Sequence, residues 1–349
     1  MKYQSNIELA PYTSLRCGGL AEYFTICNGT EELKSALTTA RGNQLWVLGY
    51  GTNSLISDHG LPGCTILVHG GDIDVQDTIV TADAGVWWDD LVETVIQRDL
   101  WGLELMSGIP SSVGAAITGN IAAYGQQVSD QLQSVSVLDT RTGEAEEILA
   151  TDIDFSYRNS SFQSLPHLIV TQATFQLSST QTTPLQYAGA KTIANERGLD
   201  EDDLIDRQAI ILEARRRAGS LYDPSDPHRS HTAGSFFKNP DVSIEQATEL
   251  ASFDESGKTL ERILQQNKVH GGTSTRASAA HALLAAGFKR GQHWGDVRLH
   301  PEHILKLENT GAATAQEIYD VAQEIMDVVE EKLGIRLEPE VKFLGEFTD

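Results

Sequence analysis

The sequence has few cysteines, few basic residues and no long apolar run. Its three cysteines, Cys17, Cys27 and Cys64, are an odd number without a C-x-x-C pair, which is typical of free thiols in a reducing compartment. The 26 Lys and Arg residues against 49 Asp and Glu residues give a net charge of -23, which argues against a general nucleic-acid or anionic-membrane surface. No run approaches the length of a transmembrane helix, and the start MKYQSNIELAPYT lacks the apolar core of a signal peptide. We therefore expect a cytoplasmic protein that binds neither nucleic acid nor membrane.

The chain does have length, core material and a mixed pattern of helices and strands. Its 349 residues, 40% of them hydrophobic, are enough for two or three domains. Caps and apolar spacing predict helices at 31–40, 89–100, 204–217, 278–286 and 315–333, and a further helix start with the capping box Ser243-x-x-Gln246. Apolar runs predict strands at 45–48, 134–138, 168–177 and 335–344, the last with Pro339 at an edge or bulge. The polar stretch 178–203 predicts the main domain boundary near its end.

The stretch HTAGSFFKNP, at 231–240, contains residue types that make little sense as ordinary scaffold. Small residues bring the backbone close to a neighbour, and Ser235 is followed by two phenylalanines that exclude water from one side of its hydroxyl. Lys238 and Asn239 then add a charge and an amide. A hydroxyl fixed in a dry turn beside a cation is typical of a proton carrier or a nucleophile. The alternative is a buried turn whose serine caps its own backbone.

Two glycine-rich segments each follow an apolar segment. The first, GYGTNS at 49–54, lacks the third glycine and the immediate helix of a Rossmann dinucleotide site. It offers a nest of backbone N–H groups that suits a diphosphate, although hairpin turns use the same residues. The second, at 108–125, is a run of small residues that either accommodates a large flat group or packs a small-residue helix. Together the segments favour one bound dinucleotide over two unrelated turns.

Clustered or flanked cations are candidate anion contacts in so acidic a chain. Arg158 stands among aromatic and hydroxyl residues, which indicates a half-buried guanidinium that binds a carboxylate or phosphate; a lone arginine is more often at the surface. The triple Arg215–Arg217 either complements a helix C-terminus or meets an anion. Two H-x-x-H pairs, at 228–231 and 300–303, have no third ligand at suitable spacing, so we expect no metal site.

Three strings, AGSFFKNP at 233–240, YR at 157–158 and LEPEV at 337–341, closely resemble the UDP-N-acetylenolpyruvoylglucosamine reductase family, and the match extends from Thr13 to Phe343. The resemblance implies an α+β protein with a two-lobed FAD-binding domain of the vanillyl-alcohol-oxidase type at 1–203, split near 70. An α+β substrate-binding domain would follow at 204–349, with a C-terminal strand that carries Glu340 back to the flavin. The implied reaction reduces UDP-N-acetylglucosamine enolpyruvate to UDP-N-acetylmuramate for peptidoglycan, with noncovalent FAD and with NADPH as cosubstrate.

The resemblance also implies roles for single residues. Ser235 matches the proton donor, and Arg158 and Glu340 match the pair that polarises the substrate carboxylate and stabilises the enol-like intermediate. Loop residues match the cofactor contacts: Gly49, Gly51, Thr52, Asn53 and Ser54 at the FAD diphosphate, and Pro110, Gly114, Ala115, Asn120 and Tyr124 at the flavin. Residues implied at the substrate diphosphate are Tyr187, Asn239 and His303, and Tyr187 indicates the subclass with a tyrosine loop. We expect a monomer.

The largest departure from the family pattern is Ala218, which stands where a lysine usually meets the substrate diphosphate. If the chain is a loop there rather than a helix, Arg217 can reach the phosphates instead, with Lys238 as a weaker candidate. Smaller departures adjust the flavin pocket: Thr52 replaces a common serine, and Ile117, Gly119 and Ala122 replace Pro, Gln and Gly.

Two other interpretations stay open at this point. Another flavin oxidase on the same scaffold would keep the glycine loops but would not need Ser235 together with Arg158 and Glu340. A catalytically silent protein that binds FAD or a nucleotide sugar would be favoured by the loss of any of these three residues, and all three are present.

Overall fold

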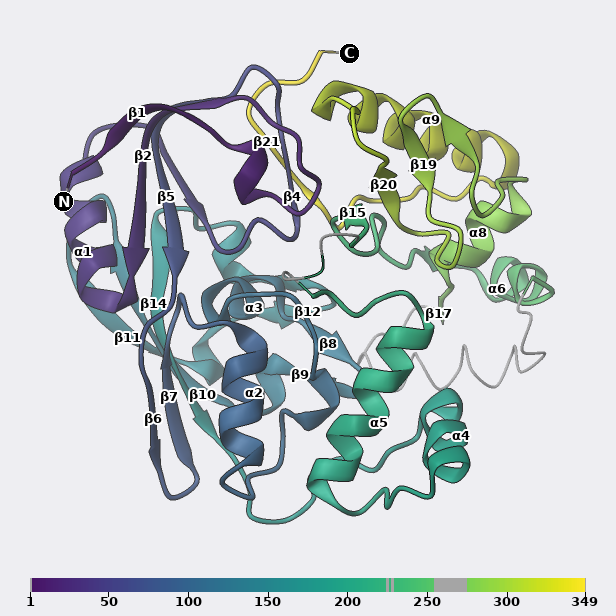
Figure 1. The fold of residues 1–349 in the computed structure, drawn as a ribbon, viewed down its shortest axis with the longest axis horizontal. Coiled ribbons are helices and arrows are strands. Elements are labelled where there is room, and N and C mark those ends of the chain that lie inside the picture. Colours follow the sequence, from purple (N-terminus) through teal and green to yellow (C-terminus); the bar gives the residue numbers. More distant parts are fainter. Residues whose placement is uncertain (1, 224–225, 227–228, 254–274, 349) are drawn as a thin grey trace. The chain divides into compact units, whose positions relative to one another are not determined.

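The computed structural model describes residues 2–223, 226, 229–253 and 275–348 (Figure 1). The chain divides into two compact units, each built from segments that are far apart in the sequence. The first unit comprises Met1–Ile7, Ala21–Tyr50 and Pro62–Asp226, and the second comprises Glu8–Leu20, Gly51–Leu61 and Pro227–Asp349. This division lies at 226/227, whereas the sequence led us to expect a boundary near 203.

One sheet of the first unit has four strands in the order β1 (Gln4–Glu8), β2 (Leu20–Asn28), β5 (Leu61–His69) and β3 (Leu45–Leu48). Strands β3 and β5 are parallel, with Leu45 opposite Cys64. Helix α1 (Gly29–Ala40) buries Leu33 and Leu37 in one cluster with Ile66 of β5. The apolar face predicted for this helix is therefore its packing face.

The other sheet of this unit is antiparallel and has five strands in the order β11 (Ala145–Leu149), β10 (Leu132–Asp139), β14 (Leu168–Gln176), β7 (Ile79–Asp83) and β6 (Ile73–Gln76). Helices α2 (Trp88–Ile96) and α3 (Val113–Gly119) share its core, where the buried Trp88 meets Phe175 of β14 edge to face at 6.3 Å. The core therefore fixes α3, which begins inside the second glycine-rich segment.

Shorter elements complete the first unit. Helices α4 (Ala188–Arg197) and α5 (Leu204–Arg217) lie side by side and share a third apolar cluster with Leu105 and Leu185 (Figure 1). This cluster is why α5 belongs to the first unit. Two two-stranded hairpins are also present, β8 (Ala122–Ala123) with β9 (Gln126–Gln127) and β12 (Phe155–Ser156) with β13 (Asn159–Ser160). Short 3-10 helices lie at 104–106, 128–130, 150–152 and 161–163.

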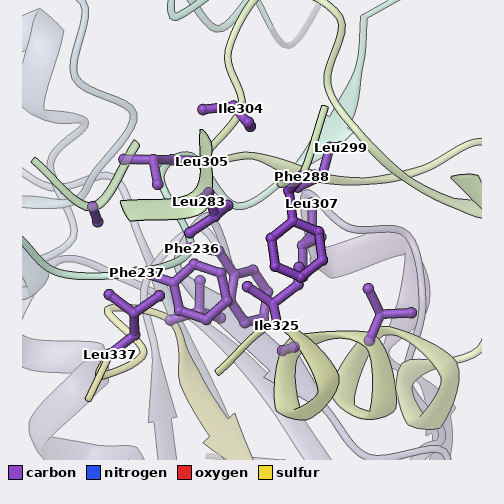
Figure 2. Packing of buried hydrophobic residues seen from close by; sticks show 14 of the residues in the cluster. Phe236, Phe237, Leu283, Phe288, Leu299, Ile304, Leu305, Leu307, Ile325 and Leu337 are labelled. Carbon is purple, nitrogen blue, oxygen red and sulfur yellow. The ribbon is translucent and has the colours of Figure 1, made fainter. Parts of the chain in front are cut away.

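The second unit contains a four-stranded sheet in the order β15 (His231–Thr232), β20 (Leu307–Asn309), β19 (Val297–Leu299) and β18 (His293–Trp294). Figure 2 shows its core, in which Phe236 and Phe237 lie among Leu283, Phe288 and Ile325. The other elements are α6 (Ile244–Ala251), α8 (Ala279–Ala285), α9 (Ala315–Leu333), a 3-10 helix at 10–12, and the strand pairs β16 (Asp241–Val242) with β17 (Thr275–Arg276) and β4 (Ser54–Ile56) with β21 (Lys342–Leu344).

Most predicted helices are confirmed, and one strand is largely wrong. Helices α5 and α9 have the predicted bounds, and Ser243 and Thr314 form the capping boxes of α6 and α9. Helix α2 ends at Ile96, earlier than expected. The strand expected at 335–344 is reduced to β21, because Pro339 has no N–H group for a ladder and makes only an isolated bridge with Phe237.

Within the described residues no helix is long and apolar enough to cross a membrane. The three cysteines are free and buried, and burial raises the pKa of Cys17 and of Cys27 to about 12. Thiols of such high pKa are protonated at neutral pH and are poor nucleophiles.

Candidate active site

The first glycine-rich loop begins on a rigid aromatic support in the first unit. The ring of Tyr50 is stacked on His69 with a centroid distance of 4.1 Å and meets the edge of Trp87 at 4.5 Å. Its hydroxyl donates to the carbonyl of Gly85 at 3.2 Å. A Cβ atom at Gly49 would lie 2.6 Å from Ser112 Oγ, so only glycine lets the loop approach this serine.

The rest of that loop, Gly51–Ser54, belongs to the second unit and is bonded to the segment that carries Glu340. The side-chain amide of Asn53 donates to the carbonyl of Glu340 at 3.1 Å, and the N–H of Lys342 donates to the carbonyl of Asn53 at 3.0 Å. Gly51 has φ +63°, and a Cβ there would lie 2.1 Å from the carbonyl oxygen of Tyr12. The expected cofactor loop and Glu340 are thus parts of one local structure.

The second glycine-rich segment forms the N-terminus of α3, as the interpretation with a small-residue helix also allowed. Ser112 is the N-cap and accepts from the N–H of Ala115 at 3.3 Å. Val113 is buried, whereas Gly114 is half-buried and Ala115 is exposed, so α3 presents small residues on its open face. A Cβ at Gly114 would lie 2.9 Å from the Cβ of Ala84. Gly114 therefore lets α3 pack closely against Ala84, and Ser112 is a cap residue that the sequence interpretation missed.

Asn120 and Tyr124 continue this segment with positive φ angles of 43° and 49°. The side-chain amide of Asn120 donates to the carbonyl of Ser156 at 3.0 Å, whereas its buried Oδ1 has no hydrogen-bond partner among the described residues. Tyr124 meets Tyr187 edge to face at 5.1 Å, and burial raises the pKa of Tyr124 to about 12. The structure thus brings together a residue expected at the flavin and one expected at the substrate.

Arg158 lies in the two-residue turn between β12 and β13 and is half-buried, as expected. Its φ is +53°, its guanidinium lies 5.8 Å from the ring centroid of Tyr157, and its carbonyl accepts from Gln163 at 3.1 Å. The hydroxyl of Ser160 donates to the carbonyl of Thr118 in α3 at 2.8 Å. The hairpin that carries Arg158 is therefore bonded to the helix expected to border the flavin.

Ser235 and Glu340 lie on two neighbouring segments of the second unit. Phe237 and Pro339 form an antiparallel bridge. On either side of it, the N–H of Glu340 donates to the carbonyl of Phe236 at 2.8 Å, and the N–H of Lys238 donates to the carbonyl of Glu338 at 2.9 Å. The buried rings of Phe236 and Phe237 anchor the first segment in the core (Figure 2).

The candidate diphosphate contacts of the second unit differ in charge. Lys238 lies 3.8 Å from the exposed Glu338, a long ion pair. Asn239 accepts from the N–H of Ala279 at 3.0 Å through Oδ1, which turns its amide NH₂ away from that bond. Burial, with a smaller effect from Lys306, lowers the pKa of His303 to about 4, so His303 is neutral at pH 7. Its buried Nδ1 has no hydrogen-bond partner within the described ranges.

Arg217 does not meet the condition under which it was expected to reach a phosphate. Helix α5 continues through Arg217, and Ala218 is its C-cap. The guanidinium of Arg217 donates to Glu213 at 2.8 Å and to Glu196 at 2.7 Å. Hydrogen bonds from Arg216 and Arg217 lower the pKa of Glu213 to about 2. Arg217 is therefore already paired with two carboxylates at the C-terminal end of its helix.

The sequence interpretation missed Arg215 as the half-buried member of the arginine triple. Its Nε donates to the carbonyl of Gly108 at 3.1 Å, and an Nη donates to the carbonyl of Ser220 at 2.9 Å. Asp89 accepts from the N–H of Gly108 at 2.6 Å, and burial lowers the pKa of Arg215. The signal was in the spacing: Arg215 follows the buried Ile211 by four residues, so both face the same side of α5.

In the part of the chain that the structure describes, no group of three or more His, Cys, Asp or Glu side chains is arranged around a common point, as a metal ion would need. His300 Nε2 lies 3.1 Å from Ser230 Oγ, in a polar contact. His228, the first residue of the other pair, lies outside the described residues.

Comparison with known proteins agrees with this geometry. Residues 21–148 match the model of an FAD binding domain, and residues 226–344 match that of the C-terminal domain of UDP-N-acetylenolpyruvoylglucosamine reductase. The fold and these matches define an FAD-dependent oxidoreductase with a flavin domain of the vanillyl-alcohol-oxidase type.

The similar proteins narrow this class to one family. UDP-N-acetylenolpyruvoylglucosamine reductase of Thermobifida fusca is 33% identical, with 98% of each chain covered, and that of Saccharopolyspora erythraea is 35% identical, with 95% of this chain and 93% of that one covered. The crystal structure of the Thermus caldophilus reductase matches with a TM-score of 0.68 and 25% identity over 99% of this chain and all of that one. The chain belongs to the UDP-N-acetylenolpyruvoylglucosamine reductase family, and it uses FAD with NADPH as reductant in peptidoglycan synthesis.

Proposed function

We propose that Ser235 donates the proton, and that Glu340 contacts the substrate carboxylate, when the chain reduces UDP-N-acetylglucosamine enolpyruvate to UDP-N-acetylmuramate. The observation that carries this proposal is the pairing of segments 236–238 and 338–340, which fixes Glu340 on a backbone next to the segment that Ser235 directly precedes. Gly234 has φ +76°, a conformation that other residues rarely adopt and that sets the direction in which the chain enters Ser235.

The chemistry needs one hydride and one proton across the carbon–carbon double bond of the enolpyruvyl group. Hydride addition to the terminal vinyl carbon leaves negative charge on the adjacent carbon and its carboxylate. Arg158 interacts more strongly with that charge than with the substrate, which lowers the barrier, and Glu340 contacts the same carboxylate. Ser235 then transfers its proton to the adjacent carbon and recovers one from solvent, so both half-steps balance.

The two glycine-rich loops fit FAD because they combine close backbone packing with small exposed groups. Gly49 and Gly114 have no room for a Cβ, and α3 presents Ala115 on its open face. Bound FAD supplies the hydride after reduction by NADPH. We assign the diphosphate to Gly49, Gly51, Thr52, Asn53 and Ser54, and the flavin border to Pro110, Gly114, Ala115, Asn120 and Tyr124.

We assign the substrate diphosphate to Tyr187, Lys238, Asn239 and His303, with Arg217 in a lesser role. Among the residues that the structure describes, Lys238 has one long ion pair, with an exposed carboxylate, whereas two carboxylates bind the guanidinium of Arg217 at short range. A cation with a weak partner loses less when it turns to a phosphate, so Lys238 is the better substitute for the lysine that Ala218 replaces.

We also propose that the enzyme is a cytoplasmic monomer that binds neither nucleic acid nor membrane. The three free, buried cysteines and the net charge of -23 support this assignment. Light scattering of the purified protein measures its mass in solution.

The test separates the two half-reactions by anaerobic rapid mixing. In Ser235→Ala, NADPH should bleach the flavin at nearly the wild-type rate, because that step needs no proton from serine. Reoxidation by the enolpyruvyl substrate should slow by about 10²–10⁴, as for loss of a general acid. Ser252→Ala, which removes an exposed hydroxyl on the C-cap of α6, should leave both rates unchanged. Comparable slowing of both steps in Ser235→Ala would show that the serine only shapes the pocket.

A further inference from the structure

The first unit contains an ion pair that is completely removed from solvent. Its members are Glu104, in the 3-10 helix at 104–106, and Arg207, in α5. Both side chains are 0% exposed, and Arg207 Nη1 lies 3.2 Å from Glu104 Oε1. The N–H of Gly102 donates to Glu104 Oε2 at 2.8 Å, and the guanidinium lies 5.1 Å from the ring of Trp101. A buried ion pair does not by itself indicate a gain in stability, because well-packed apolar residues in its place often stabilise a fold equally.

Glu104 connects this pair to the hairpin that carries Tyr124. Gln126, in β9, donates to Glu104 Oε1 at 3.0 Å and accepts from the N–H of Leu105 at 2.8 Å. Gln126 is buried and lies two residues after Tyr124, with Gly125 at φ +97° between them. The position of the hairpin turn is therefore set by the buried carboxylate.

Arg207 connects the same pair to the segment that carries Tyr187. Its Nη1 also donates to the carbonyl of Thr183 at 2.7 Å, four residues before Tyr187, and its Nε donates to the carbonyl of Glu201 at 2.9 Å. These two carbonyls lie on either side of α4, which Tyr187 caps at its N-terminus. The tyrosines thus meet edge to face while both of their segments are bonded to one ion pair.

Helix α5 extends this connection to the second glycine-rich segment. Arg207, Ile211 and Arg215 follow one another at four-residue intervals, so they share a face of the helix. A helix moves as a rigid body over this length, so a shift at Arg207 displaces Arg215 as well. Arg215 donates to the carbonyl of Gly108, two residues before Pro110.

From these contacts, and given the proposed role of Tyr187 at the substrate diphosphate and its edge-to-face contact with Tyr124, we infer that Glu104 and Arg207 are positioning residues for the substrate half-reaction. They touch neither tyrosine. They fix the backbone segments of both, together with the helix that carries Arg215, and so set where the substrate contacts lie. A purely structural pair would instead affect activity only through the amount of folded protein.

The experiment replaces the pair by neutral groups of similar size, in Glu104→Gln/Arg207→Met. The expected result at saturating FAD is a KM for the enolpyruvyl substrate raised about tenfold, with the KM for NADPH within about twofold of wild type, because small displacements of binding groups are costly. Leu37→Ala, in the separate cluster beneath α1, is the control for lost stability and should leave both KM values unchanged.

An unchanged substrate KM in the double variant would overturn the inference, as would an equal rise in Leu37→Ala. If the double variant does not fold, Gln126→Met cuts only the link to the hairpin and should raise the substrate KM at least about threefold, and an unchanged KM there is equally decisive. Failure of the proposed roles of Ser235 and Glu340 is distinguishable, because it would appear as equal slowing of both half-reactions in Ser235→Ala, whatever the KM of the double variant.

Discussion

Acidification tests the burial of His303, because the structure lowers the pKa of this imidazole from 6.5 to about 4. Burial is the main cause, and the positive charges of Lys306, His300 and Arg290 add to it. His303 is therefore neutral in the folded chain at a pH where the unfolded chain already binds a proton. Its contribution to stability is complete above about pH 6.5 and is lost as the pH falls from there towards 4.

The size of the loss follows from the two pKa values. With 6.5 in the unfolded chain and about 4 in the folded chain, the free energy of unfolding falls by about 1 kcal/mol at about pH 5.5 and by about 2–3 kcal/mol at about pH 4.5. His303→Gln keeps a polar side chain of similar size but has no proton to bind. Between neutral pH and about pH 4.5, the free energy of unfolding should therefore fall by about 2–3 kcal/mol less in the variant than in the wild type.

The assay is urea unfolding at several pH values, followed by fluorescence, for the wild type, His303→Gln and His293→Gln. His293 is an exposed histidine of the same unit, so its substitution should leave the pH dependence of the wild type in place. His300 and His231 also have lowered pKa values, so they too make the wild type less stable on acidification. The effect of His303 is therefore the difference in pH dependence between the wild type and His303→Gln. If His303→Gln loses as much stability on acidification as the wild type, the imidazole is not buried in its neutral form.

The remaining predictions concern the cofactor and the substrate diphosphate. Gly114→Leu extends a position whose Cβ would already lie 2.9 Å from Ala84, so the folded protein should purify colourless or bind FAD at least about tenfold more weakly; full flavin absorbance would refute the loop assignment. Lys238→Met should raise the substrate's KM roughly tenfold, since a lost charge-assisted contact costs about 1.5–3 kcal/mol, while Arg217→Ala should raise it by less than about threefold. Steady-state kinetics at saturating NADPH measures both, and the reverse ranking would return the phosphate contact to Arg217.

Local signals were enough to predict the helices. The capping box at Thr314, the apolar face of α9 and the stop at Gly334 are all within one stretch of chain, and the structure has the predicted bounds. The same holds for α5, whose N-cap Asp203 accepts from the N–H groups of Ile205 and Asp206. Where short-range hydrogen bonds and one apolar face decide the structure, the sequence contains the needed information.

Long-range pairing could not be read from the same signals. Residues 335–341 look like strand because they alternate in polarity, but Pro339 leaves only the three residues of β21 to pair with β4. The bridge between Phe237 and Pro339 joins segments about a hundred residues apart, and no local pattern announces such a contact. The resemblance to a family predicts Ser235 and Glu340 as one pair, and the physical reason that their segments are neighbours is visible only in the fold.

The same contrast governs the question of which cation meets the substrate diphosphate. A count of charges favours the arginine triple, because it is the densest cluster in a chain with a net charge of -23. The structure distributes those charges differently: Arg215 is bonded to backbone carbonyls, and Arg216 and Arg217 both bind Glu213. His303 is neutral at pH 7 and can offer a hydrogen bond but no charge. Within the described ranges Lys238 is left with a single long ion pair, to an exposed carboxylate, and it directly follows the two phenylalanines that anchor the Ser235 segment. The least clustered of these cations is therefore the one whose charge is most available to a phosphate.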